Sequence, residues 1–181
     1  MKGMKNLNNY PWSYPLHSGD YNEMLYPHYW QWVQPNECYQ PYTPVRDCGS
    51  KPHAINIKYA TKQNSTFRTA IWTGKHLQVT LMCINVGEDI GLEVHHHNDQ
   101  FLRIESGLGL VLMGDQKDQL TYQKRVEDGS AIFVPAGKWH NIINTGHQPI
   151  KLYTIYAPPE HALGTIHLTK ADAIQAEKEH D

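Results

Sequence analysis

The sequence predicts an all-β domain, either a sandwich or a barrel, preceded by an extended arm. Two observations indicate this. From residue 67 onward, short runs of aliphatic, β-branched and aromatic residues are separated by Gly, Asn or Asp, as in all-β folds. The first 52 residues are instead rich in proline and aromatic residues. A chain of 181 residues is long enough for one hydrophobic core, so we expect one domain with extensions.

The arm comprises residues 1–52 and precedes a domain over residues 53–181. It holds seven of the eleven prolines, seven of the eleven tyrosines and three of the five tryptophans. Proline interrupts helices and central strands, whereas aromatic side chains offer large surfaces for packing. We expect the arm to wrap around the domain or a neighbouring subunit. A disordered tail is the alternative, disfavoured because disordered segments contain few aromatic residues.

Nine short strands are expected, most of them bounded by a turn-forming residue. In order they are FRTAIWTG, LQVTLMCIN, LEVH, QFLRIE, LGLVLMG, LTYQKRV, AIFVP, NIINTG and IKLYTIYAP. One or two helical turns are expected at residues 60–64. A polar helix is expected over TKADAIQAEKEH, with Thr169 as its N-cap.

Composition excludes several classes of partner. A net charge of −2 and a pI near 6.6 provide no basic surface for nucleic acid or an anionic membrane. No apolar run approaches a membrane-spanning length, and the N-terminus lacks the apolar centre of a secretory signal. We therefore expect a cytoplasmic protein whose partner is a small molecule or another protein.

The three cysteines match no zinc-binding spacing. Cys83 lies in an apolar run, so we expect a buried thiol. Cys38 and Cys48 are expected to be unpaired thiols, and a disulfide between them is the alternative in an oxidising environment.

A five-point pattern runs through GSAIFVPAGKWHNIIN, at Gly129, Pro135, Gly137, His140 and Asn144. The strand AIFVP ends at a turn made by the proline and the second glycine. His140 then begins the return strand, pointing inward with one ring nitrogen free for a metal. The pattern matches the second motif of the cupin superfamily at every fixed position, so this stretch resembles a cupin.

The first cupin motif is matched when it is aligned on Gly87 and Gly107. Glu93 then stands where the family has its first histidine, His95 at the second histidine, and Gln100 where the family has glutamate. Anchoring the motif on the conspicuous His95 and His97 instead breaks the spacing on both sides. The match therefore departs from the family in residue type but not in interval.

Strand periodicity favours the same alignment. Glu93 and His95 are two residues apart, and Gln100 shares its face with Leu102 and Ile104, which marks that face as inward. Four candidate metal ligands should thus converge: Glu93, His95, Gln100 and His140. The resemblance implies a jelly-roll barrel, and this donor set suits one divalent Fe, Mn, Ni, Co or Zn ion.

Four further residues are second-rank candidates for the site. His97 falls where the chain is already turning. His161 and His167 follow the last strand and could fold back near the barrel mouth for proton transfer. Tyr153 is the fourth, and because it lies on the opposite face of the last strand from Tyr156, at most one of these two tyrosines can point inward.

The resemblance covers about residues 53–177 and is to bacterial single-domain cupins labelled mannose-6-phosphate isomerase-like. That label is an analogy of fold and does not indicate the reaction. We expect a metal-binding enzyme acting on a small oxygen-bearing substrate by isomerase- or dioxygenase-type chemistry, with no general acid or base identifiable. The alternative is a non-catalytic ligand-binding module or a structural module like those of spore coats, since its tyrosine-rich arm resembles segments of cross-linked assemblies. Edge strands and the arm suggest a homodimer.

Overall fold

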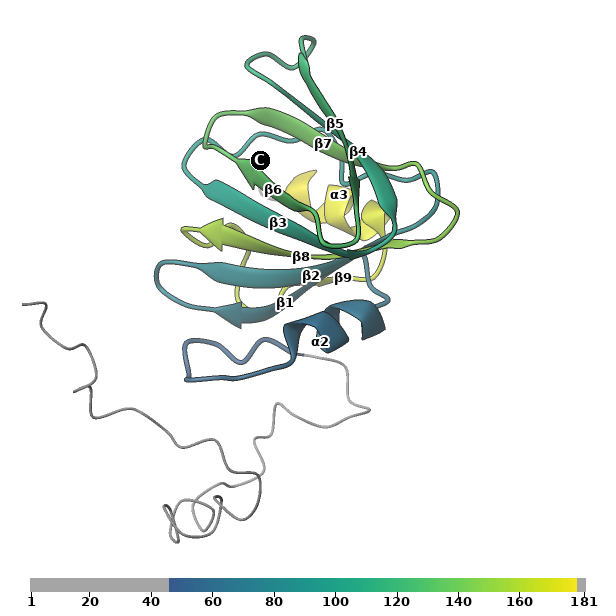
Figure 1. The fold of residues 1–181 in the computed structure, drawn as a ribbon. Helices are drawn as coiled ribbons and strands as arrows, with labels where there is room; N and C mark the ends of the chain where they lie inside the picture. The colour runs from purple at the N-terminus through teal and green to yellow at the C-terminus, as the bar shows by residue number, and fades with distance from the viewer. Residues whose placement is uncertain (1–45, 179–181) are drawn as a thin grey trace, which may run out of the picture. The chain divides into compact units, whose positions relative to one another are not determined.

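The computed structural model describes residues 46–178, and the all-β prediction is confirmed. Two antiparallel sheets form the body of this part of the chain (Figure 1). The larger sheet contains, in spatial order, β6 (Ala131–Val134), β3 (Asp99–Ser106), β8 (Ile150–Ala157), β2 (Gln78–Ile84), β1 (Arg68–Thr73) and β9 (Ile166–His167). The smaller sheet contains β5 (Tyr122–Glu127), β4 (Leu108–Gly114) and β7 (Trp139–Asn144).

Two strand predictions need correction. The expected strand LEVH forms no ladder, because Gly91 just before it has a φ of 95° and breaks the extended backbone. Instead Glu93 makes an isolated bridge with His140, in which the two residues exchange backbone hydrogen bonds of 3.1 and 2.9 Å. Conversely, β9 was not expected, because two residues are too few to show a periodic pattern.

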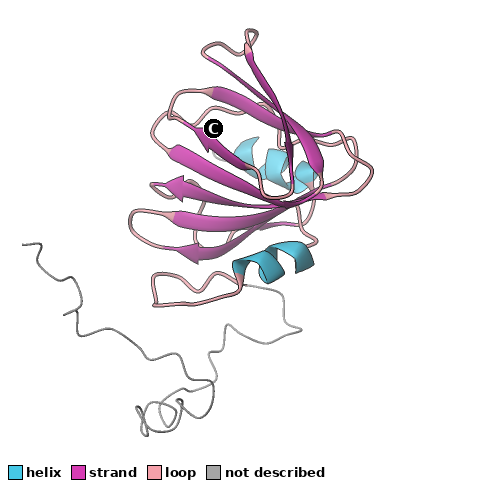
Figure 2. Ribbon diagram, viewed as in Figure 1, coloured by secondary structure: helices cyan, strands magenta, loops and turns pink. Residues whose placement is uncertain are grey.

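Two short helices accompany the strands (Figure 2). Helix α2 (Ile57–Gln63) begins at Asn56, whose side chain accepts a hydrogen bond from the Tyr59 amide. Helix α3 (Lys170–Lys178) begins as predicted: the Thr169 hydroxyl accepts from the Asp172 amide, and the Asp172 carboxylate accepts from the Thr169 amide. Neither helix is long and apolar enough to cross a membrane.

The inner faces of the sheets are divided into an apolar and a polar part. Fourteen buried apolar residues form one cluster, to which β2, β3 and β8 contribute Met82, Ile84, Leu102, Ile104, Ile150 and Leu152. Further along the same inward faces the residues turn polar: Gln78, Thr80, Gln100, Thr154 and Tyr156, all at most 3 % exposed. The apolar part stabilises the barrel, and the polar part surrounds the candidate site.

Other sequence expectations have mixed outcomes. Cys83 is a buried free thiol, as predicted. Residues 1–45, which include Cys38 and most of the arm, lie outside the described residues, so their predicted packing and a disulfide to Cys48 stay predictions. So does the homodimer.

Candidate metal centre

Three side chains meet at the polar part of the barrel: Glu93, His95 and His140. Their potential ligand atoms all lie within 4.8 Å of one another. The same carboxylate oxygen, Oε1 of Glu93, is 3.3 Å from Nε2 of His95 and 3.3 Å from Nε2 of His140. The backbone bridge between Glu93 and His140 fixes two of these side chains relative to each other. A carboxylate and two imidazoles therefore point at one small volume.

The protonation of His140 follows from its hydrogen bond. Its Nδ1 is 3.0 Å from the carbonyl oxygen of Lys138, which can only accept, so Nδ1 carries the proton. The other nitrogen, Nε2, is buried without a hydrogen-bond partner among residues 46–178. It faces the Glu93 carboxylate, an arrangement that is repulsive unless a proton or a metal ion lies between them. The donors therefore fit a metal ion.

His95 lies between two carboxylates. Its Nδ1 is 3.1 Å from Oε1 of Glu160, while its Nε2 faces Glu93. Burial opposes protonation of His95, but the hydrogen bonds to Glu160 and Glu93 outweigh it and raise the pKa of the imidazole to about 9. With a metal on Nε2, the ring would be neutral and would keep its Nδ1 proton on Glu160. A carboxylate in that place orients a ligating histidine and raises its basicity.

Glu93 is ionised in this environment. Burial favours its neutral form, but the close approach of the His140 and His95 rings and the charge of Arg68 outweigh burial and hold the pKa of the carboxyl well below its usual range. Nη2 of Arg68 is 3.8 Å from Oε2 of Glu93, so the oxygen facing the two histidines is not the one facing the arginine.

Gln100 is the fourth predicted ligand and lies on the inward face of β3, opposite Tyr156 of β8. It is 3 % exposed, and its Nε2 donates to the Thr154 hydroxyl at 3.2 Å. Its Oε1 is buried and has no hydrogen-bond partner in the described part of the chain. An amide oxygen left unpaired next to this cluster is available to a metal or to a substrate.

Two second-rank candidates lie away from the cluster. His97 is exposed and contacts the ring of His96, with ring centroids 6.5 Å apart. Tyr153 is on the outer face of β8, where it packs against Leu81 and other residues under α2. It is Tyr156 that points inward, fully buried, with its ring centroid 5.4 Å from that of His95.

The other two, His161 and His167, lie near the polar interior. The ring centroid of His161 is 5.1 Å from that of Tyr156, and its Nε2 is buried. Burial, assisted by the Arg68 charge, lowers the pKa of His161 to about 3, so the ring is neutral. His167 stands opposite Arg68 in the β1–β9 ladder. Burial lowers the pKa of His167, and the charge of Arg68 lowers it further.

Sequence reasoning missed Arg68 and Glu160. The signal for Arg68 was an arginine inside the run FRTAIW, where a charged residue on a strand bounded by apolar residues is unusual. Glu160 gave no signal, because its contact with His95 joins a loop to a segment 65 positions earlier in the chain.

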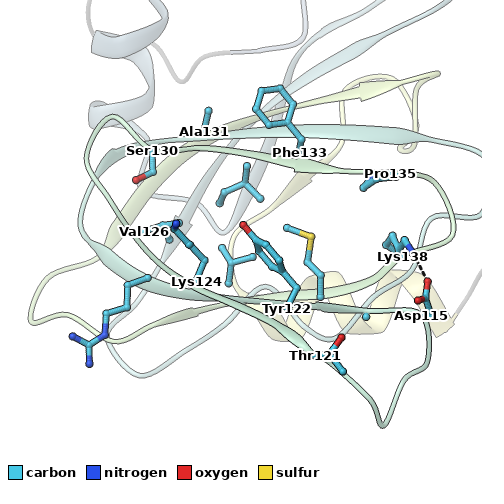
Figure 3. Close-up of a pocket in the computed structure, with 15 residues that line it drawn as sticks. Asp115, Thr121, Tyr122, Lys124, Val126, Ser130, Ala131, Phe133, Pro135 and Lys138 are labelled. Carbon is cyan, nitrogen blue, oxygen red and sulfur yellow. Dashed lines mark hydrogen bonds and ion pairs between the residues drawn. The ribbon is translucent and has the colours of Figure 1, made fainter.

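A cavity of about 580 Å³ opens between β4 and β5 on one side and β6 on the other (Figure 3). Tyr122, Val126 and Met113 are among its lining residues, and Lys138 at its wall is ion-paired with Asp115. Met113 stands directly opposite His140 in the β4–β7 ladder. The cavity therefore lies beside the strand that supplies His140 to the cluster.

A two-sheet barrel with ligand-type residues at these motif positions defines a cupin, and the chain belongs to the cupin superfamily. A sequence model of that family, described as the cupin domain, matches residues 80–156. This confirms the resemblance inferred from the two motifs.

Relatives in several organisms share most of the described region. The chain is 65 % identical over 133 residues to the uncharacterized protein YrkC of Bacillus subtilis, covering 74 % of this chain and 72 % of the relative. It is 40 % identical over 115 residues to the uncharacterized protein L612 of Acanthamoeba polyphaga mimivirus, covering 63 % and 70 %. The crystal structure of BH2720 from Bacillus halodurans is 60 % identical, with a TM-score of 0.72 over 72 % of this chain and 99 % of that one.

Proposed function

We propose that this cupin binds one divalent transition metal through Glu93, His95 and His140, with Gln100 as a fourth, weaker ligand. The observation that supports this most strongly is the Glu93 oxygen that lies 3.3 Å from two imidazole nitrogens. Lone pairs held this close repel one another in the absence of a cation or an added proton. Two imidazoles, a carboxylate and an amide suit Fe(II), Mn(II), Ni(II), Co(II) or Zn(II).

We further propose that the protein is an enzyme acting on a small oxygen-bearing substrate, by isomerase- or dioxygenase-type chemistry. The bound ion supplies Lewis acidity, or activation of O₂ if it is iron. Glu160 holds the Nδ1 proton of His95, and its side chain, 30 % exposed, can exchange protons with water. The cavity lined by Met113, the β4 partner of His140, offers room for a substrate beside the strand that carries this histidine.

Metal analysis of the full chain without a histidine tag tests the metal site. After reconstitution and dialysis we expect about one divalent ion per chain in the wild type. Glu93→Gln and His140→Gln should lose most of it, whereas His97→Gln, altering an exposed histidine nearby, should keep it. A wild type that retains no transition metal at neutral pH would refute the proposal.

A non-catalytic structural module is the second candidate, and the tyrosine-rich composition of residues 1–52 favours it. Such a module would associate through surfaces that do not need the metal. Sedimentation of the full chain with and without chelator separates the two: metal-independent assembly into large particles, with no change in any substrate tested, would support the module. A chain that keeps one size under both conditions would count against it.

A further inference from the structure

A buried arginine beside the metal cluster has unsatisfied hydrogen-bond donors. Arg68 is 1 % exposed, and its Nε and Nη1 are buried without a hydrogen-bond partner among residues 46–178. Its ion-pair contacts, to Oε2 of Glu93 at 3.8 Å and to Oε1 of Glu177 at 3.9 Å, are longer than hydrogen bonds. A buried guanidinium is costly unless its N–H groups are satisfied, so these donors call for a further acceptor.

Two uncharged side chains near Arg68 also have a buried polar atom without a hydrogen-bond partner in the described residues. The hydroxyl of Tyr156 and Nε2 of His161 are both buried without a partner in the described residues. Their rings contact each other, and the ring of Tyr156 also contacts that of His95. A tyrosine hydroxyl can donate a hydrogen bond. Arginine and tyrosine donors thus border the same cluster.

The charges around the cluster favour an anion. When a divalent ion binds neutral His95 and His140, the two positive charges of the ion and the one of Arg68 exceed the two negative charges of Glu93 and Glu160. Glu177 adds little to the balance, because its side chain is 63 % exposed and water screens it. A buried excess of positive charge is stabilised by a bound anion.

We propose that Arg68 and the Tyr156 hydroxyl bind the carboxylate of a small anionic substrate beside the metal cluster. The guanidinium presents paired N–H groups that match the two oxygens of a carboxylate, and the tyrosine hydroxyl supplies a further hydrogen bond. This inference rests on the proposed metal-dependent function and deepens it: the substrate is a small carboxylic acid and not a neutral sugar.

Calorimetric titration of the metal-loaded full chain with glycolate tests the inference, with glycolamide as its uncharged counterpart and a carboxylate-free buffer. We expect glycolate to bind at one site per chain, and glycolamide to bind about 10-fold more weakly or worse, because it lacks the charge that Arg68 recognises. Metal content is measured on the same samples. A chain that takes up no metal refutes the proposed function, whereas a metal-loaded chain that does not bind glycolate refutes only the carboxylate site.

Two variants locate the bound anion. Arg68→Lys keeps the charge beside Glu93 but loses the paired N–H groups, so glycolate affinity should fall about 10- to 100-fold with metal content unchanged. Tyr156→Phe removes only the hydroxyl and keeps the ring, so we expect the variant to fold and to bind glycolate about 3- to 10-fold more weakly. Arg103→Lys, on the outer face of β3 with a 45 % exposed side chain, is the matched control and should bind as the wild type does.

The outcomes separate a substrate site from a structural arginine. Unchanged glycolate affinity in both Arg68→Lys and Tyr156→Phe, with folding verified by circular dichroism, would overturn the proposal. So would glycolamide binding as tightly as glycolate. Loss of affinity in Tyr156→Phe alone would support it even if Arg68→Lys failed to fold.

Discussion

At the scale of single residues, the site depends on which imidazole nitrogens carry protons. The Lys138 carbonyl keeps the His140 proton on Nδ1, and Glu160 does the same for His95. Both Nε2 atoms are thereby directed at Glu93. The sequence motifs located Glu93, His95 and His140, but the groups that set their protonation come from a backbone carbonyl and a loop.

Glu160→Gln should weaken metal binding about 10- to 100-fold, the usual effect of removing a carboxylate that supports a ligating histidine. Glu127→Gln, an exposed glutamate on β5, is the control and should leave affinity unchanged. Competition with a chelating dye measures both. Equal affinities in the two variants would show that Glu160 does not act on His95.

The metal-free protein should lose stability as pH rises from about 6.5 to 9. His95 has a pKa of about 9 when folded, whereas a free histidine side chain has a pKa of about 6.5, so the folded state binds the proton more tightly. Its contribution is complete below pH 6.5 and disappears as pH passes 9. Chemical denaturation across this range, in the presence of chelator, measures the slope.

His95→Gln should flatten that slope, whereas His97→Gln, at an exposed position, should keep it. The slope, not the absolute stability, is compared, since replacing a buried histidine also alters packing. If His95→Gln retained the full wild-type slope, another group would be responsible.

At the scale of elements, a loop between β8 and β9 holds Glu160 over the cluster. Gln78 of β2 donates to the His161 carbonyl and accepts from the His161 amide, both at 2.9 Å. Asn98 donates to the carbonyl of Pro158 at 2.7 Å. Hydrogen bonds from β2 and from the residue before β3 thus fix both ends of the segment that carries Glu160.

Gln78→Ala should destabilise the protein by about 1–3 kcal/mol, because it leaves two partly buried backbone groups of His161 without their hydrogen bonds. It should also weaken metal binding several-fold by releasing Glu160. Gln123→Ala, on the exposed strand β5, should do neither. Thermal unfolding and metal titration of both variants check this; a Gln78→Ala protein with wild-type metal affinity would mean that the loop does not support the site.

The sequence allowed the regular elements and the motif residues to be predicted, because their periodicity and spacing are local. The interval from Gly87 to Gly107 identified Glu93 and Gln100 despite their unusual types. The sequence could not show that LEVH forms only an isolated bridge and no ladder, nor that Tyr156 rather than Tyr153 points inward. The contact between Glu160 and His95 could not be predicted either, because it depends on the path of the loop between β8 and β9.

At the scale of the whole molecule, the described domain has an apolar core and a polar interior, and the polar interior contains the metal-ligand candidates. The apolar cluster of fourteen buried residues contains none of the metal-ligand candidates, although its Val134 stands opposite Gln100 in the β3–β6 ladder. Its burial does not depend on an ion. Among residues 46–178, the polar interior instead contains single polar atoms without a hydrogen-bond partner, on Arg68, Gln100 and His140. We therefore expect the folded barrel to position the candidate ligands before an ion binds.

Metal removal should therefore leave the fold intact. With chelator, the far-ultraviolet circular dichroism should be unchanged, and the melting temperature should fall only by the amount that binding of the ion contributes. Thermal unfolding at several metal concentrations measures that amount. Loss of secondary structure on chelation would mean that the metal is required for folding and not only for the site.

An anomalous-difference map from crystals of the metal-loaded protein tests the central claim most directly. We expect one peak at the polar end of the barrel, about 2.0–2.3 Å from Glu93 Oε1 and from Nε2 of His95 and His140, with Gln100 Oε1 completing the ligands. A peak bound by His97 in place of Glu93, or no peak at the cluster when metal analysis finds an ion, would contradict it.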